Sequence, residues 1–249
     1  ELNMLVETVN GMIQRMHRDS RAAYQAQLDL RQTEIERQKT EIAALKKHIN
    51  AHFTVNGLNV ISALNRKGDV AKANQMSESL SHVFRYAYHE DEKIGLLDEM
   101  FMLGQFIDVM RYSLDKEIAY QYELDDALYE YKIPRMLLQP LVENAIVHGF
   151  AGRMTGCIVS VTALIESGNV KLIVRDNGHG IEACALRAIQ QKLALPADET
   201  IPAGINHVAL KNISMRLKAL YGESATLSID NTEFPEDNGL AVTLVFPLS

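Results

Sequence analysis

The sequence has 249 residues, of which 47% are hydrophobic, and its formal net charge is −7. This length and apolar content allow a buried globular core, with room for two domains or for one domain and extended helices. The acidic balance argues against a nucleic-acid-binding surface, which needs clustered Lys and Arg, and favours proteins and metal-bound nucleotides as partners.

The first 48 residues have the spacing of one long helix. Apolar residues follow three-four spacing over residues 2–16 with no capping residue before them, so we expect a helix that enters from upstream. Leu28, Ile35 and Ile42 stand seven apart, which predicts a two-stranded coiled coil over residues 19–48. The apolar seam of residues 2–16 and that of residues 28–42 are out of phase, which predicts a stutter between them. Such a break is typical of signal relays, and a neutral irregularity of the coiled coil is the equal alternative.

This helix is expected to run on through His52 to about Asn65, where Lys67-Gly68-Asp69 predicts a helix stop and a turn. A second helix follows over Val70 to His89, and a third over Asp98 to Leu114. Because two helices joined by a tight turn bury little surface alone, we expect residues 49–115 to form a dimeric four-helix bundle.

Beyond residue 116 the sequence alternates between apolar and polar residues, as half-buried strands do. Five strands are expected, over residues 118–124, 157–165, 170–175, 225–229 and 240–246. Helices are expected over Pro134–His148, Ile181–Lys192 and Val208–Leu220, with Pro134 in a first helical turn. Residues 194–206 are expected to be a mobile loop, where a lid over a nucleotide would lie. The order of elements predicts an α+β two-layer sandwich.

Asn144 and Asp176 have the chemistry of a nucleotide site. An amide oxygen on a helix, such as that of Asn144, is a suitable ligand for magnesium. Asp176 ends an apolar strand and opens Asp176-Asn177-Gly178-His179-Gly180, where a carboxylate can accept from the adenine amino group and glycines let the backbone approach the base. Taken alone, Asn-Gly after a strand is also a hairpin signal. The order of helix, strand, glycine motif and a helix with Lys211 and Asn212 resembles the Bergerat-type ATP-binding fold, and this resemblance favours the nucleotide site.

A zinc site is not expected in this sequence. His148, His179 and His207 follow no metal-ligand pattern, and neither do Cys157 and Cys184, which have the character of reduced thiols. The sequence contains no run of about 18 apolar residues, which is the pattern that predicts a membrane span.

His52 is a candidate phosphoryl acceptor. A neutral imidazole is a competent nucleophile near neutral pH, so a histidine facing solvent on a helical bundle can accept a phosphoryl group without a catalytic triad. Asn56 lies four residues on, shares its helix face and could orient a water on the phosphorylated form. A structural role is the alternative for a helical histidine.

Two family resemblances follow from these motifs. The glycine motif in its order of elements resembles the Bergerat-type ATP-binding fold of GHKL ATPases, and residues 49–59 resemble the phosphoacceptor box of LytS/YesM-type sensor histidine kinases. The second resemblance covers residues 40–249. It includes Ile49-Asn50, His52-Phe53, Asn56, Leu58-Asn59, Phe84-Arg85-Tyr86, the block from Leu138 to Ile146, His148-Gly149, Arg216-Leu217 and Leu220-Tyr221-Gly222.

The resemblance implies a homodimeric kinase that uses ATP and Mg²⁺ to phosphorylate His52 and passes the phosphoryl group to an aspartate of a response regulator. It implies that Asn144 binds the metal, and that the nucleotide contacts Asn144, His148, Asp176, Gly178, Gly180, Lys211 and Asn212. Glu143 is the candidate for polarising the acceptor imidazole, with a helix-surface or capping role as the alternative.

The resemblance also divides the chain. Residues 1–13 resemble the second helix of a HAMP domain, so residues 1–18 are expected to end such a relay and residues 19–48 to form a signalling coiled coil. Residues 49–115 would hold the dimerisation and phosphoacceptor helices, and residues 116–249 the ATP-binding domain. The expected location is the cytoplasmic side of a bacterial membrane, below a transmembrane sensor that is absent from this sequence.

The sequence departs from the family pattern at three places. Ala51 replaces the proline before the acceptor, and Thr54 and Val55 replace a leucine and an aromatic residue. The phosphate loop Gly-Ile-Gly-Leu-Arg-Asn is replaced by His207-Val208-Ala209-Leu210-Lys211-Asn212, whose side chains obstruct close approach of backbone amides to phosphates, although Gly204-Ile205 lies just before it. We therefore expect weak nucleotide binding or conditional catalysis. A degenerate dimeric scaffold that binds a signalling partner is the alternative, whereas a chaperone- or topoisomerase-type ATPase is disfavoured because no transducer domain is recognisable.

Overall fold

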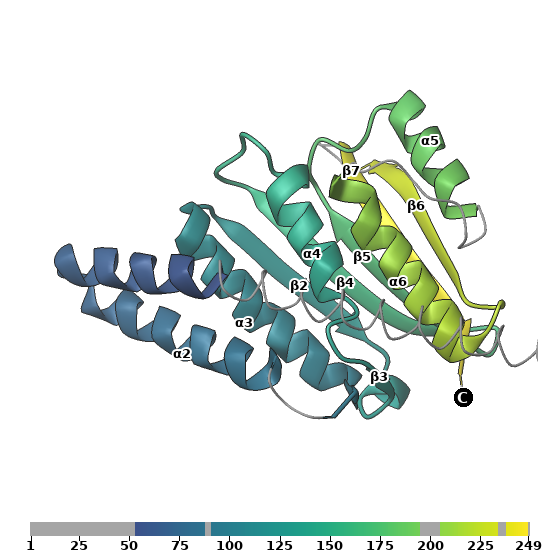
Figure 1. Ribbon diagram of the computed structural model, residues 1–249, viewed down its shortest axis with the longest axis horizontal. Coiled ribbons are helices and arrows are strands. Elements are labelled where there is room, and N and C mark those ends of the chain that lie inside the picture. Colours follow the sequence, from purple (N-terminus) through teal and green to yellow (C-terminus); the bar gives the residue numbers. More distant parts are fainter. Residues whose placement is uncertain (1–52, 88–90, 195–204, 234–237, 249) are drawn as a thin grey trace, which may run out of the picture. The chain divides into compact units, whose positions relative to one another are not determined.

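The computed structural model describes residues 53–87, 91–194, 205–233 and 238–248 (Figure 1). The chain divides into two compact units, residues 1–56 and 57–249, and only residues 53–56 of the first unit are described. The predicted relay helix, the predicted coiled coil and His52 therefore lie outside the described residues. Within those residues, no helix has the length and hydropathy needed to cross a membrane.

The helical stop predicted at Lys67-Gly68-Asp69 is confirmed. Residues 53–66 are helical, Gly68 takes a left-handed φ of +80°, and α2 spans Val70–Ala87. The Asp69 N–H donates to the Leu64 carbonyl at 3.0 Å, which closes the end of the first helix. The glycine is required here because a side chain is strained in this backbone conformation.

The helix predicted over Asp98 to Leu114 is also confirmed, and it begins two residues earlier than predicted. It is α3, Leu96–Leu114, and it ends at Asp115, whose φ is 52°. α3 packs on α2 and also contacts β2 and α4, while Phe101 on α3 remains exposed. The core between α2 and α3 is apolar and includes Ala73, Met76, Leu80, Val83, Met100, Leu103 and Ile107.

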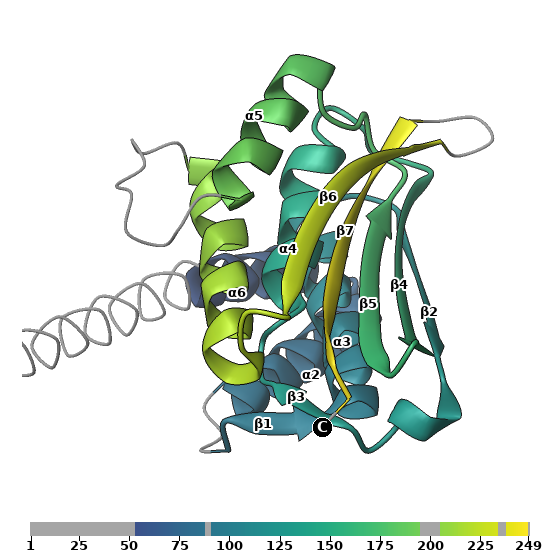
Figure 2. The same cartoon turned by 90° about the vertical axis from the view of Figure 1, so that its right-hand side faces the viewer.

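All five predicted strands form one sheet, in the order β2-β4-β5-β7-β6. The strands are β2 Ile118–Leu124, β4 Cys157–Glu166, β5 Asn169–Asp176, β6 Thr226–Glu233 and β7 Asn238–Pro247. β2 and β4 are parallel, and the other pairs are antiparallel, with Val161 opposite Val174. Alternate residues are buried, and Figure 2 shows α4, α5 and α6 together on one side of the sheet. This is the α/β layering that the sequence predicted.

The helix predicted over Pro134–His148 is wrong in its first five residues. Pro134 ends a three-residue strand, β3 Lys132–Pro134, which pairs with β1 Lys93–Gly95. A proline lacks the N–H needed inside a ladder but is tolerated at the edge of a short strand. The helix α4 spans Gln139–Asn144, with Pro140 in its first turn, and continues as the π-helical segment η2, Ala145–Gly149.

The hairpin alternative for Asn177-Gly178 is wrong, because β5 leads through a loop into α5, Ala183–Ala194. α6 spans Ile205–Tyr221 and so begins three residues before the predicted Val208. Residues 205 and 206 are therefore helical, whereas they were predicted to belong to the loop. A short 3-10 helix, η1 Asp126–Leu128, completes the elements of the described residues.

Candidate functional site

The end of β5 and the end of η2 meet at two glycines. The His179 N–H donates to the Gly149 carbonyl at 3.2 Å. A β-carbon on Gly178 would lie 2.3 Å from that carbonyl oxygen, and one on Gly149 would lie 2.9 Å from Asp176 Oδ1. Real side chains do not fit at such distances, so both glycines are needed for this close approach. The contact brings His148-Gly149 next to the Asp176 loop.

Asp176 is a buried carboxylate with a fixed orientation. Asp176 is 4% exposed, and its Oδ1 accepts the Gly178 N–H at 2.9 Å. Burial raises its pKa to about 6, against the opposing effect of the Gly178 and Leu240 backbone donors. A desolvated carboxylate at a glycine-lined loop is a candidate acceptor for a polar ligand group.

Asn177 holds the neighbouring chain in place. Its Oδ1 accepts the Ile158 N–H at 2.7 Å, and its Nδ2 donates to the Gly156 carbonyl at 2.9 Å. Arg153 donates to the Asn177 carbonyl at 3.0 Å. Because each of these contacts is internal, Asn177 supports the loop, while Asp176 beside it remains the candidate binding group.

Gly180 and Asn231 fix the far side of the loop. Gly180 has a φ of +67°, and a β-carbon there would lie 3.0 Å from Asn231 Oδ1. Asn231 accepts the Ile181 N–H at 2.9 Å and donates to the Ile181 carbonyl at 2.7 Å. Sequence reasoning missed Asn231, since a single asparagine in β6 carries no signal of a contact 50 residues away.

Glu143 and Asn144 end α4, and His148 follows in η2. Glu143 and Asn144 are half-buried, whereas His148 is exposed. Burial raises the pKa of Glu143, which makes its carboxylate more basic than an exposed one. Single π-turns within helices are frequent at functional sites, and η2 is where this helix meets the Asp176 loop.

Lys211 and Asn212 lie on α6, which contacts α4. Lys211 is half-buried and Asn212 is exposed. His179, between the two glycines, directs Nδ1 to the Gly180 carbonyl at 2.8 Å. Asn56 belongs to the first unit, on the helix of residues 53–66. Within the described part of the chain, no three His, Cys, Asp or Glu side chains gather as a metal-ligand cluster.

The described fold is thus an α/β domain with a five-stranded sheet and an attached helical hairpin, formed by α2 and α3. Comparison with known proteins adds the family. The family model described as histidine kinase matches residues 40–118. The chain belongs to the histidine kinase family and, by its relatives, to the LytS type of sensor histidine kinase.

Three relatives illustrate the similarity. The sensor histidine kinase YpdA of Escherichia coli (strain K12) is 35% identical over 188 residues, which is 74% of this chain and 31% of that protein. The sensor protein LytS of Staphylococcus haemolyticus is 33% identical, over 84% of this chain and 36% of that protein. LytS of Bacillus subtilis (strain 168) is 32% identical, over 84% of this chain and 35% of that protein. The chain therefore spans about a third of the length of these relatives.

Solved structures resemble the fold more distantly. The catalytic domain of histidine kinase ThkA is 14% identical with a TM-score of 0.44, and the match covers 62% of this chain and 95% of that one. The histidine kinase domain of a blue-light activated kinase from Erythrobacter litoralis is 15% identical with a TM-score of 0.42. This match covers 80% of this chain and 94% of that one.

Proposed function

We propose that this chain is the kinase part of a two-component sensor, which uses ATP to phosphorylate His52 and passes the phosphoryl group to an aspartate of a response regulator. Its place in the family supports this function. The observation that carries the proposal is Asp176, a buried carboxylate oriented by Gly178 and set against Gly149. A site of this kind suits the amino group of a purine.

The other site residues take roles around the nucleotide. The Asn144 amide oxygen would bind Mg²⁺, which prefers oxygen ligands and keeps most of its coordination for phosphates and water. Gly178 and Gly180 would let the base lie against the loop backbone, with His148 at its edge. Lys211 would offer charge to a phosphate and Asn212 a hydrogen bond.

The reaction is a phosphoryl transfer. A ring nitrogen of His52 attacks the γ-phosphorus of ATP, the bond from this phosphorus to the bridging oxygen breaks, and ADP leaves with that oxygen. Glu143 would hold the proton of the other ring nitrogen, because its burial favours a proton-accepting carboxylate. Asn56 would orient the water that later hydrolyses the phosphohistidine.

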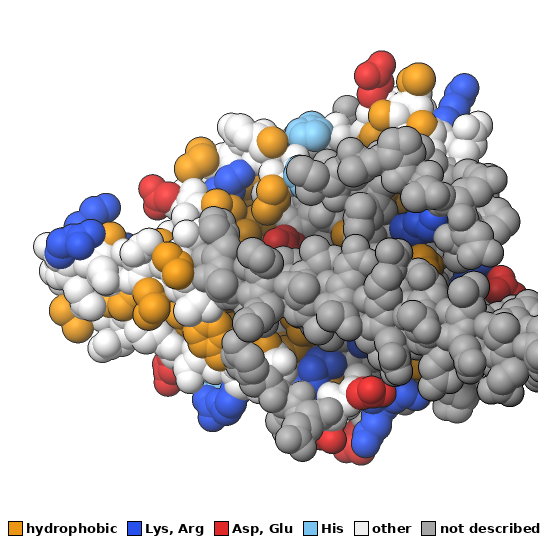
Figure 3. Space-filling view, viewed as in Figure 1, with side chains coloured by type: hydrophobic (Ala, Val, Ile, Leu, Met, Phe, Trp, Pro, Cys, Tyr) orange, Lys and Arg blue, Asp and Glu red, His pale blue; other side chains and the backbone are white. Residues whose placement is uncertain are grey.

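The same proposal covers the organisation of the whole protein. Residues 1–18 would end a HAMP-like relay, 19–48 a coiled coil, 49–115 the dimerisation and phosphoacceptor helices, and 116–249 the ATP-binding domain. The helix of residues 53–66, α2 and α3 expose Leu58, Val70 and Phe101 respectively, each more than half exposed, and Figure 3 shows hydrophobic side chains over this part of the surface. Exposed apolar side chains on paired helices support a homodimeric bundle. The chain would lie on the cytoplasmic side of a bacterial membrane, as part of an anchored receptor.

One observation favours a second function, a dimeric scaffold that does not turn over ATP. α6 already begins at Ile205, so residues 207–212 are helical and do not form an open glycine loop. Beyond the first turn of α6, from Ala209 on, backbone N–H groups are bonded to carbonyls and are not available to phosphates. This backbone supports weak nucleotide binding, or turnover that requires α6 to unwind.

Titration of ATP into the full chain with Mg²⁺ tests the nucleotide site. Asp176→Asn is expected to weaken ATP affinity by about tenfold to a hundredfold, the effect of losing a charged acceptor. Asp98→Asn, an exposed position in the first turn of α3, is the matched control and should bind as the original chain does. Equal affinity of the Asp176 variant and the control would overturn the site, and absence of binding in all three proteins would favour the scaffold.

A further inference from the structure

A buried carboxylate outside the nucleotide site joins the helical hairpin to α4. Glu99 of α3 is 1% exposed. Its Oε2 accepts the Met136 N–H and its Oε1 the Leu138 N–H, each at 3.3 Å. Both donors belong to the segment that leads from β3 into α4, and Leu138 is the N-cap residue of α4. Glu99 therefore contacts the start of the helix that presents Glu143 and Asn144.

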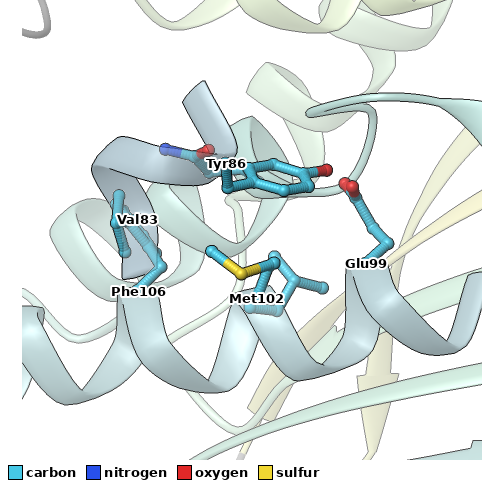
Figure 4. A pocket seen from close by; sticks show the side chains of 7 residues that line it. Val83, Tyr86, Glu99, Met102 and Phe106 are labelled. Atoms are coloured by element: carbon cyan, nitrogen blue, oxygen red, sulfur yellow. The ribbon is translucent and has the colours of Figure 1, made fainter. Parts of the chain in front are cut away.

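The segment bonded to Glu99 has an unusual backbone. Met136 has a φ of 57°, a left-handed conformation that a bulky side chain seldom adopts and that persists only where neighbouring groups fix it. Its N–H also points to the Tyr86 hydroxyl at 3.1 Å. Figure 4 shows the Tyr86 hydroxyl and the Glu99 carboxylate directed toward one another, beside a small hollow lined by Val83, Met102 and Phe106. Two side chains from the hairpin thus fix one turn.

Two arginines extend the cluster to α6. Arg216 of α6 donates to the Arg135 carbonyl at 2.9 Å. Arg135 donates to the Tyr86 carbonyl at 2.6 Å, and its guanidinium lies 4.6 Å from the centre of the Tyr86 ring. Burial raises the pKa of Glu99 to about 7, against the lowering effect of the Leu138 and Met136 N–H donors and of both guanidinium groups. Tyr120 of β2 is a further ionisable neighbour, whose pKa is raised by burial and, to a smaller extent, by Tyr122 and the Glu99 charge.

We propose that Glu99 is a positioning residue, which holds residues 136–138 and thereby fixes α4, with Glu143 and Asn144, relative to α2, α3 and α6. The inference rests on the proposed function for its effect on phosphoryl transfer. The placement of the segment by Glu99 is a separate claim, since it can be measured without nucleotide.

Hydrogen exchange of the full chain without nucleotide tests the placement. Glu99→Gln keeps the shape and one acceptor, Glu99→Ala removes both, and Asp98→Asn changes an exposed neighbour. Exchange over residues 136–144 is expected to rise about tenfold in Glu99→Ala, which corresponds to about 1.4 kcal/mol of lost protection, and less in Glu99→Gln. Asp98→Asn should leave it unchanged. Equal protection in all four proteins would overturn the inference.

Tyr86→Phe distinguishes a local loss of protection from a general loss of folding. It removes the hydroxyl acceptor at Met136 but keeps Glu99, so exchange should rise at Met136 and stay unchanged at Leu138. A uniform rise over the whole chain in Glu99→Gln, in place of a rise confined to residues 136–144, would show a merely structural role and overturn the inference.

The effect on transfer is measured by the rate of His52 labelling from ATP. Glu99→Gln should lower kcat about tenfold with the KM for ATP within about twofold, the pattern of a misplaced catalytic group. An unchanged kcat would contradict positioning. If the original chain takes no label, the proposed function fails, and hydrogen exchange alone decides whether Glu99 holds the segment.

Discussion

Gly178 and Gly149 approach so closely that a β-carbon on Gly178 would lie 2.3 Å from the Gly149 carbonyl oxygen. The two residues come from different elements, the loop after β5 and the end of η2, and their contact sets the distance between Asp176 and the α4 segment. Substitution tests this contact directly. Gly178→Ala should destabilise the protein by about 1–3 kcal/mol, as overpacking does, and weaken nucleotide binding.

Gly104→Ala is the matched control for that change. Gly104 lies within α3, and the nearest atoms to an added β-carbon there, on Tyr120, are at 3.7 Å, an ordinary contact. Alanine in a helix interior is favoured over glycine by about 0.5–1 kcal/mol, so this variant should be as stable as the original chain or more so. Urea unfolding gives both values. A Gly178→Ala protein as stable as Gly104→Ala would show that the close approach does not exist.

Asp176 should make stability depend on pH. Its pKa is raised from 3.8 to about 6, so the folded state binds the proton more tightly than the unfolded state. This contribution is fully present below pH 3.8 and is lost as pH rises through about 6. It amounts to about 3 kcal/mol, at about 1.4 kcal/mol for each pH unit between the two values.

Unfolding of Asp176→Asn across this pH range should therefore lack the corresponding slope, while Asp98→Asn keeps it. Nucleotide affinity should change in the opposite sense, rising as pH increases through about 6, because the ionised carboxylate is the better acceptor. The same slope in both variants would assign the pH dependence to another group.

The strands and most helix bounds could be predicted from the sequence, because alternation and three-four spacing persist over seven or more residues. β1 and β3 could not, since three residues are too few to show a period. Pro134 was misplaced for a related reason: a proline is typical of a first helical turn, and only pairing with Lys93 makes it a strand residue.

The candidate site was found through residue types in a fixed order, which is why Asp176 and Gly178 were recognised. Asn231 and Glu99 were not. A carboxylate in an amphipathic helix suggests a solvent-facing position, and nothing local shows that Glu99 is buried against Met136 and Leu138 N–H groups 37 and 39 residues away. Contacts of that range are created by the tertiary fold alone.

Asn177 should matter for stability and little for chemistry. Asn177→Ala leaves the Ile158 N–H without its partner, which costs about 1–3 kcal/mol if this group stays unpaired, whereas the exposed Gly156 carbonyl keeps its bond from Arg153. Asn169→Ala, at the exposed end of β5 with one long bond to Ser167, is the control and should cost under about 0.5 kcal/mol. Thermal unfolding separates the two, and equal loss in both would show that Asn177 is not a structural clamp.

Glu143→Gln tests the role of this carboxylate. If Glu143 holds the imidazole proton, kcat for His52 labelling should fall about a hundredfold to ten-thousandfold with little change in the KM for ATP. Glu123→Gln, an exposed glutamate on β2, is the control and should label at the original rate. Equal labelling of the two variants would leave Glu143 with a capping or surface role only.

Labelling with ATP that carries a radioactive γ-phosphate tests the central claim most directly. With Mg²⁺ present, the full chain should acquire label that acid removes, as expected for phosphohistidine, and the label should be absent from His52→Ala and strongly reduced in Asp176→Asn. His48→Ala, with a histidine removed four positions away, should label as the original chain does. Label that persists in His52→Ala, or no label in any of the proteins, would contradict the account.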